Sequence, residues 1–292
     1  MKIQFCGVRG STPAPGIEFV RYGGHTSCLA LSHDGGLGSD AEPDPQARRP
    51  TLVLDAGAGL TSVTSLLGGA PFDGTILLTH LHWDHVLGLP FFAAADNEHA
   101  RVSVMLPEQE SGAGAASVLA GIMSPPYFPI EPTELRGEWT FATVAEGEQV
   151  IEGFTVLARE IPHKGGRTFG YRISDGHSTL AYIPDHCPTT LGPGEDGFGE
   201  YHPAAIELAK EADVLVHDAQ LFPAELAAEA DFGHSVADYS VELARRAGTR
   251  SVKLFHHRHN RTDDALDGLA QRLGGGSTPA VSVAAEGTVL EL

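Results

Sequence analysis

Three histidines and one aspartate crowd into a single short motif, His80-Leu81-His82-Trp83-Asp84-His85. Imidazole nitrogens and carboxylate oxygens are the ligands that zinc and its first-row neighbours prefer in proteins. The preceding run Ile76–Leu78 has the length and apolar composition of a buried strand. Such a strand places the ligands that follow it at the edge of a sheet, where a cleft can form. The motif therefore predicts a metal site rather than a solvated polar loop.

The spacing within this motif favours two metal ions over one. In a turn, His80 and His82 can point to one side while Asp84 and His85 point to another. Each ion would still need ligands from elsewhere in the chain, because zinc takes about four. We therefore expect further His and Asp residues at the ends of later strands.

Three later apolar or β-branched runs are each followed closely by a candidate ligand. They are residues 154–162 before His163, 178–183 before Asp185, and 251–255 before His256 and His257. Taken singly, each of these residues is more often an ordinary surface or capping group. The repeated pattern of strand and then ligand favours a shared metal site.

On these motifs the chain resembles the metallo-β-lactamase-fold hydrolases over nearly its whole length, and within them the ribonuclease Z and cyclic phosphodiesterase branch. The resemblance implies an α/β (α+β layered) fold, a four-layer αββα sandwich. It also implies the ligands by position: His80, His82 and His163 for the first metal, Asp84, His85 and His256 for the second, and Asp185 as the bridging carboxylate. We choose His256 over His257 because His256 directly follows the strand.

Two further segments are similar to motifs of the ribonuclease Z-like enzymes. Residues 214–219 read as a strand that ends in His217-Asp218, and residues 233–238 read as the start of a helix with Ser235 as its N-cap. The resemblance implies that His234 reaches the scissile phosphate and that an acid orients it. That acid would be Asp218, where the family usually has the longer Glu. A carboxylate partner fixes the tautomer of an imidazole and raises its basicity. The alternative is that His234 is an exposed residue of an ordinary helix start.

The expected chemistry is hydrolysis with two divalent metal ions as cofactors. Zinc suits the ligand set, which manganese and iron also accept. A metal-bound hydroxide would attack phosphorus or a carbonyl carbon. Asp84 could also accept a hydrogen bond or the proton from the nucleophile, and His234 could stabilise the transition state or protonate the leaving oxygen. No nucleophilic serine or cysteine is required.

The charge balance constrains the substrate. The 292 residues carry 38 acidic and 19 basic side chains, which gives a net charge of −19 and disfavours a large nucleic-acid footprint. Short-type ribonuclease Z enzymes have a long glycine-rich and basic arm between the ligands that match His163 and Asp185, and this chain has only a strand and a short turn in its place. We therefore expect a small phosphodiester, such as a cyclic nucleotide or cyclic phosphate, as the substrate.

Two other functions remain open at this stage. The first is a carbonyl hydrolase on the same metals, namely a lactonase, thioesterase or β-lactamase, because a fold alone does not fix a substrate. The second is a non-catalytic metal-binding sensor that keeps the fold. The predicted pair His234 and Asp218 disfavours the first, and the complete ligand set disfavours the second.

The organisation of the chain favours one hydrolase domain over residues 1–292. The candidate ligands extend from residue 80 to residue 256, and apolar strands alternate with helical segments at 201–212 and 236–247. The N-terminal residues 1–5 read as a strand rather than a signal peptide, and no stretch is long and apolar enough to span a membrane. The cysteines indicate neither a disulfide framework nor a zinc site. We expect a cytoplasmic protein without a membrane partner, and a homodimer remains open.

Four loops are not assigned a definite role by the sequence. The Gly-rich segments 7–16 and 22–28 contain Arg9 and His25, and they are either anion-binding loops or simply tight turns. The polar segment 32–50 is expected to be a mobile hairpin insertion outside the catalytic site. The apolar and aromatic segment 121–130 is either a wall or lid of the active site or a satellite of the core.

Overall fold

A computed structural model describes residues 1–33, 49–109, 111–274 and 278–292. Most of segment 32–50, for which we expected a hairpin insertion, lies outside the described residues. No helix in the described ranges is long and apolar enough to cross a membrane.

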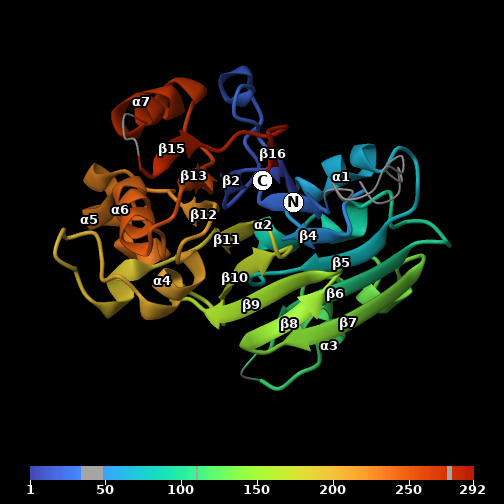
Figure 1. Cartoon of the computed structure of the whole chain (residues 1–292). Coiled ribbons are helices and arrows are strands. Elements are labelled where there is room, and N and C mark those ends of the chain that lie inside the picture. The colour runs from blue at the N-terminus through green and yellow to red at the C-terminus, as the bar shows by residue number, and fades with distance from the viewer. Residues whose placement is uncertain (34–48, 110, 275–277) are drawn as a thin grey trace, which may run out of the picture.

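The described residues form two seven-stranded sheets and one two-stranded sheet (Figure 1). The first sheet has the order β16 (Val289–Glu291), β1 (Lys2–Gly7), β3 (Cys28–Ser32), β4 (Leu52–Leu54), β5 (Asp73–Leu77), β6 (Arg101–Pro107) and β7 (Glu138–Val144). The second has the order β15 (Ala280–Val283), β13 (Ser251–Phe255), β12 (Val214–Asp218), β11 (Thr179–Ile183), β10 (Phe169–Ser174), β9 (Phe154–Glu160) and β8 (Gly147–Ile151). The small sheet pairs β14 (His257–Arg258) with β2 (Arg9–Gly10).

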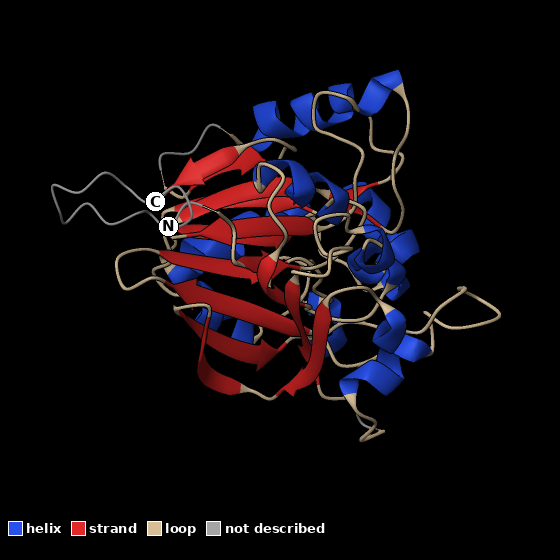
Figure 2. Cartoon of the chain, turned by 90° about the vertical axis from the view of Figure 1, so that its right-hand side faces the viewer, coloured by secondary structure: helices blue, strands red, loops and turns tan. Residues whose placement is uncertain are grey.

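Helices cover the outer faces of the two large sheets (Figures 1 and 2). The α-helices are α1 (Leu60–Leu66), α2 (Trp83–Val86), α3 (Ala115–Ala120), α4 (Pro203–Ala209), α5 (Leu226–Glu229), α6 (Ala237–Ala247) and α7 (Asp263–Leu273). The short 3-10 helices are η1 (Ile17–Phe19), η2 (Leu89–Phe91), η3 (Pro132–Glu134), η4 (Pro188–Leu191), η5 (Pro223–Glu225) and η6 (Ala230–Phe232). Helices α1 and α3 contact the first sheet, whereas α4, α6 and α7 contact the second.

The alternation of side chains along the strands explains the layers. In β4, Leu52 and Leu54 point into the core between the two sheets, while Val53 points into the core beneath the helices of the first sheet. On the facing sheet, Phe154 and Val156 of β9 join the same central core. Because successive side chains of a strand point to opposite faces, a strand buried on both faces is apolar throughout. The fold therefore has the order helix, sheet, sheet, helix, and the predicted αββα sandwich is confirmed.

The strands that precede the candidate ligands end at the same edge of the molecule. Strands β11, β12 and β13 pair in parallel, so their carboxyl ends lie side by side. Strand β9 is antiparallel to β10, and β10 is antiparallel to β11, so β9 runs in the same direction as these three. The predicted helical segments 201–212 and 236–247 contain α4 and α6.

The central core makes a testable contribution to stability. Leu54 is fully buried between the sheets, so we expect Leu54→Ala to lower the free energy of unfolding by about 2–5 kcal/mol through lost burial and the cavity that remains. Chemical denaturation would measure this change. Val150 in β8 is 74% exposed, and we expect Val150→Ala to change stability by no more than about 0.5 kcal/mol. Equal effects of the two substitutions would contradict this assignment of the core.

Candidate metal centre

The His-rich motif occupies the turn between β5 and α2. His82 is the N-cap residue of α2 and has extended backbone angles, and Asp84 and His85 lie in the only turn of this short helix. His80, Asp84 and His85 are all buried. The change from strand to extended turn to helix directs the four ligand side chains toward different parts of the sheet edge.

His80, His82 and His163 form the first cluster. Their ligand nitrogens all lie within 4.8 Å of one another. The Nε2 atom of His163 lies 3.2 Å from Nδ1 of His82. The loop after β9 therefore brings a third imidazole to the two from the motif.

Asp84, His85 and His256 form the second cluster. The Nε2 atom of His256 lies 3.0 Å from Oδ2 of Asp84 and 3.3 Å from Nε2 of His85. His256 has a left-handed backbone with φ of 59°, which turns its ring into the cluster. The adjacent His257 points elsewhere, and its Nε2 lies 2.8 Å from the carbonyl oxygen of Ala284. The structure thus brings His256, and not His257, to the other ligands.

Asp185 lies between the two clusters. Its Oδ2 is 2.8 Å from Nε2 of His85 and 3.6 Å from Nε2 of His80. Its Oδ1 is 3.3 Å from Nε2 of His256. One carboxylate therefore faces imidazoles of both clusters.

The donor atoms fit divalent cations. Among the described residues, His80 Nε2 and both oxygens of Asp185 are buried without a hydrogen-bond partner. Burial lowers the pKa of His163 to about 4 and holds that of His80 well below its usual range, so both imidazoles keep a free lone pair. Burial alone would raise the pKa of Asp185, but the facing His256 and His85 hold it well below its usual range. A buried anionic carboxylate surrounded by imidazole nitrogens is a donor set typical of zinc and related metals.

Hydrogen bonds on the side away from the cluster orient the rings of His85 and His163. Oδ2 of Asp55 accepts hydrogen bonds from Nδ1 of His85 at 2.9 Å and from the hydroxyl of Tyr182 at 2.8 Å. Oδ1 of Asp55 accepts a hydrogen bond from the backbone N–H of Thr79 at 2.7 Å. The Nδ1 atom of His163 donates to the carbonyl oxygen of Gly233 at 2.7 Å. Such partners fix the tautomer of a metal-binding histidine, so that the other nitrogen faces the cluster.

Asp55 is the site residue that the sequence analysis missed. It directly follows the short apolar strand β4, which is the same pattern that identified His163, Asp185 and His256. Its backbone is left-handed with φ of 58°, and its side chain is fully buried. The signal was therefore present, but the Asp-Ala-Gly sequence that follows β4 is equally typical of a simple turn.

His234 lies beside the cluster and contacts Asp218. The Nδ1 atom of His234 is 3.0 Å from Oδ2 of Asp218 and 3.2 Å from Oδ1 of Asp185. The shorter side chain of Asp therefore reaches His234 directly. Burial disfavours the imidazolium, but the charges of Asp218 and Asp185 outweigh burial and raise the pKa of His234 to about 10. The ring centroid of His234 lies 5.3 Å from that of His163 and 5.0 Å from that of His256.

The prediction that Ser235 caps the following helix is wrong. Helix α6 begins at Ala237 with Val236 as its N-cap residue and has no side-chain cap. The Ser235 hydroxyl instead donates to the carbonyl oxygen of His186 at 2.8 Å, and its N–H donates to Oδ2 of Asp218 at 3.2 Å. Tertiary contacts that hold Asp218 thus replace the local cap.

The two Gly-rich loops enclose the side chain of Arg9. This side chain is fully buried, donates from Nε to the carbonyl oxygen of Gly23 at 2.7 Å, and donates from Nη1 to that of Arg261 at 2.6 Å. It is therefore not available to a phosphate in solution. His25 is half-exposed, and its Nδ1 lies 3.0 Å from Oε2 of Glu286.

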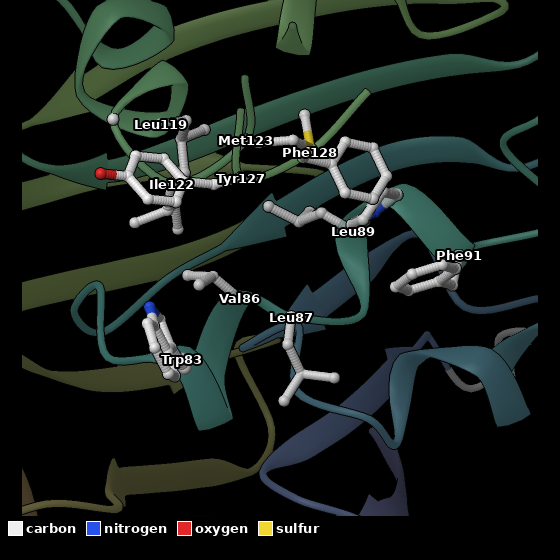
Figure 3. A pocket seen from close by; sticks show the side chains of 12 residues that line it. Trp83, Val86, Leu87, Leu89, Phe91, Leu119, Ile122, Met123, Tyr127 and Phe128 are labelled. Carbon is white, nitrogen blue, oxygen red and sulfur yellow. The ribbon is translucent and has the colours of Figure 1, made fainter. Parts of the chain in front are cut away.

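The aromatic segment 121–130 contributes one wall of a cavity beside α2 (Figure 3). Figure 3 shows Ile122 and Tyr127 across the cavity from Trp83 and Val86. Between β10 and β11 the chain makes only a tight turn over residues 175–178, so no arm projects there.

Comparison with known proteins identifies the family. Residues 52–257 match the family model described as the β-lactamase superfamily domain. The match covers most of the chain, and the protein therefore belongs to this superfamily. It is a metal-dependent hydrolase of the metallo-β-lactamase fold, as the sequence predicted.

Curated relatives and solved structures agree with this assignment. Ribonuclease Z from Geobacillus kaustophilus is 26% identical over 224 residues, covering 62% of this chain and 69% of the relative. Ribonuclease Z from Salinibacter ruber is 28% identical over 226 residues, covering 62% of this chain and 67% of that relative. The metallo-β-lactamase fold protein YhfI from Bacillus subtilis superposes with a TM-score of 0.67 at 18% identity, covering 99% of both chains. The short form of human tRNase Z superposes with a TM-score of 0.65 at 19% identity, covering 100% of this chain and 99% of that one.

The contacts of Asp55 yield a prediction about metal affinity. In Asp55→Asn, one of the two carboxylate oxygens becomes an NH₂ group. If this is Oδ2, the hydrogen bonds from His85 and Tyr182 are lost; if it is Oδ1, the hydrogen bond from the backbone N–H of Thr79 is lost. We expect metal affinity to fall by about 10–100-fold, measured by competition with a chromogenic chelator. Asp213→Asn is the matched control, because Asp213 also accepts a backbone N–H, from Thr179, but lies outside the cluster. Unchanged affinity in Asp55→Asn would exclude a role for this carboxylate in orienting His85.

Proposed function

We propose that this protein is a dinuclear metal-dependent phosphodiesterase that acts on a small phosphodiester, such as a cyclic nucleotide or cyclic phosphate, and that residues 1–292 act as one hydrolase domain. The proposal is supported by the donor clusters, by the adjacent pair His234 and Asp218, and by the ribonuclease Z relatives.

In this proposal the clusters hold two divalent ions, with zinc as the expected metal and manganese or iron as alternatives. The ligands are His80, His82 and His163 for the first ion, Asp84, His85 and His256 for the second, and Asp185 between them. Bound there, the ions would supply an activated water and neutralise negative charge on the phosphate.

The single observation that carries the phosphodiesterase proposal is the contact between His234 and Asp218. Because the carboxylates of Asp218 and Asp185 both lie on the Nδ1 side, the Nε2–H is left to meet the substrate. Among the described residues, Nε2 of His234 makes no hydrogen bond. An imidazole held in this way can donate to a non-bridging phosphate oxygen or protonate the leaving oxygen. We assign Asp218 the role of holding His234 in that orientation.

Asp84 is proposed to do more than bind metal. Its Oδ2 also accepts a hydrogen bond of 2.6 Å from the backbone N–H of Ser11. This contact, together with that to His256, holds the carboxylate in place at the edge of the second cluster. From there Asp84 could accept a hydrogen bond, or the proton, from the attacking water.

A small substrate is favoured by the charges near the cluster. Three arginines near the cluster in sequence are paired with acids: Arg167 with Glu160, Arg258 with Glu229, and Arg261 with Glu225. The exposed Lys164 beside His163 donates to the backbone carbonyl of Asp231 at 2.8 Å. The net charge of −19 opposes a polyanion. A small phosphodiester needs few cationic contacts, because its single charge would lie at the metal ions.

A substrate panel tests the proposed function. We expect the metal-replete protein to hydrolyse bis(p-nitrophenyl) phosphate and either 2′,3′- or 3′,5′-cyclic nucleotides, and His234→Ala to lower kcat by about 10²–10⁴-fold, because a proton donor in the transition state is lost. His177→Ala, at an exposed histidine of the β10–β11 turn, is the control and should retain activity. Turnover of a lactone or a thioester without phosphodiester hydrolysis, and indifferent to His234, would instead identify a carbonyl hydrolase. Metal binding without turnover of any of these would favour a sensor.

Metal analysis tests the ligand assignment independently of activity. We expect about two equivalents of zinc per chain, and fewer in His163→Ala, because the first cluster then has two imidazoles in place of three. Removal of metal by a chelator should lower the melting temperature, since the ions bind the folded state only. His99→Ala is the control, because this side chain is 78% exposed. If the wild-type protein bound one equivalent of zinc per chain and His163→Ala did not change this number, the dinuclear assignment would be contradicted.

A further inference from the structure

A cavity of about 530 Å³ lies beside the metal-binding helix α2 (Figure 3). Trp83, Val86 and Leu87 line it from α2 and the residue that follows. These positions are spaced i, i+3 and i+4, so they share one face of the helix, and the intervening Asp84 and His85 point to the cluster. The same turn of helix therefore serves the metal centre on one side and the cavity on the other.

The walls of the cavity are apolar, and four of the twelve residues that line it are aromatic. Phe91 follows α2 on one wall, and Tyr127 and Phe128 belong to the segment 121–130 on the other. The rings of Phe91 and Phe128 meet edge to face with centroids 6.0 Å apart and join the two walls. Of the described residues that line the cavity, none has a charged side chain. The volume lies in the range of small-molecule sites, which are typically apolar with few polar groups.

Three of the aromatic side chains are exposed although they border this cavity. Trp83 is 73%, Tyr127 80% and Phe91 61% exposed. Among the described residues, the indole N–H of Trp83 and the hydroxyl of Tyr127 have no hydrogen-bond partner. A flat ligand between them would bury their faces and could also pair with these two polar groups, which favours an aromatic ring that contains or bears hydrogen-bonding atoms.

The position of Trp83 connects the cavity to the reaction site. Trp83 is the residue between the candidate ligands His82 and Asp84, and neighbouring Cα atoms are about 3.8 Å apart. His82 is itself only partly buried at the start of α2. A group that stacks on Trp83 therefore lies one residue along the chain from both His82 and Asp84, although neither of these two side chains lines the cavity.

We propose that this cavity binds an uncharged aromatic or heteroaromatic ring of the substrate while the phosphodiester lies at the metal clusters. The inference rests on the proposed function and extends it, because it specifies aryl or nucleoside phosphodiesters over alkyl or simple sugar phosphates. In an aryl diester the ring is the ester group that does not leave, and in a cyclic nucleotide it is the base of the one nucleoside that carries both ester oxygens. Its burial contributes affinity without any charge.

Kinetics with two matched substrates test the inference. Phenyl p-nitrophenyl phosphate and methyl p-nitrophenyl phosphate share a leaving group and differ only in the second ester group. We expect kcat/KM to favour the phenyl ester by about tenfold or more, because a phenyl ring buries far more apolar surface than a methyl group. Ile122→Glu and Tyr127→Ala change exposed positions of the cavity wall. Each should bring the ratio of kcat/KM for the phenyl ester to that for the methyl ester closer to one. Val150→Glu, which adds the same charge at an exposed site in β8, should retain it.

Tryptophan fluorescence tests ring binding without turnover. The chain has two tryptophans, Trp83 and Trp139, so Trp139→Phe leaves Trp83 as the only reporter. We expect adenosine to change its emission saturably, ribose to have no effect, and Ile122→Glu to abolish the response. If Trp139→Phe fails to fold, the difference between wild type and Trp83→Phe reports the same signal.

The two experiments separate this inference from the proposed function. Phosphodiester hydrolysis without a preference for the phenyl ester, together with no response to adenosine, would overturn the ring-binding cavity and leave the phosphodiesterase intact. Saturable adenosine binding without hydrolysis of any phosphodiester would support the ring site and contradict the proposed function.

Discussion

The buried carboxylate of Asp185 at one sheet edge is the constraint on which the rest of the structure depends. Asp185 is 1% exposed, and its oxygens lie 2.8 Å from His85, 3.2 Å from His234 and 3.3 Å from His256. Burying such a group of charges costs several kcal/mol unless each is well paired, which is a large part of the stability of a domain. Cations between Asp185 and the facing imidazoles would remove this cost. Folding and metal binding are then linked, because the same atoms determine both.

Strand direction explains how ligands far apart in the sequence reach this edge. Strands β9, β11, β12 and β13 all run the same way, so the residues that follow them leave the sheet on one side. His163, Asp185, Asp218 and His256 occupy these positions. The arrangement follows the general rule that bound molecules lie outside the carboxyl ends of parallel strands. If any one of these strands ran in the opposite direction, the candidate site residue at its carboxyl end would lie at the opposite end of the molecule.

The sequence predicted the parts of the site that depend on local patterns. An apolar run followed by His or Asp predicts both a strand and a candidate ligand, and the structure brings His163 and His256 into the two clusters. It could not predict contacts that are set by tertiary packing. Ser235 has the local signature of a helix cap, but its hydroxyl binds a distant carbonyl group. Arg9 has the signature of an anion ligand, but it is buried among backbone carbonyls. The cavity beside α2 joins segments that no local pattern relates.

Recognition by an apolar cavity fits the electrostatics of this chain better than recognition by charge. Its net charge of −19 repels polyanions, and arginines such as Arg167 are already paired with acids. A ring beside Trp83 would contribute binding free energy that is insensitive to that repulsion. Binding energy from a part of the substrate that does not react can be used to position the part that does. Because Trp83 lies between two candidate ligands on one helix, ring stacking in the cavity and alignment of the phosphodiester would then be the same event.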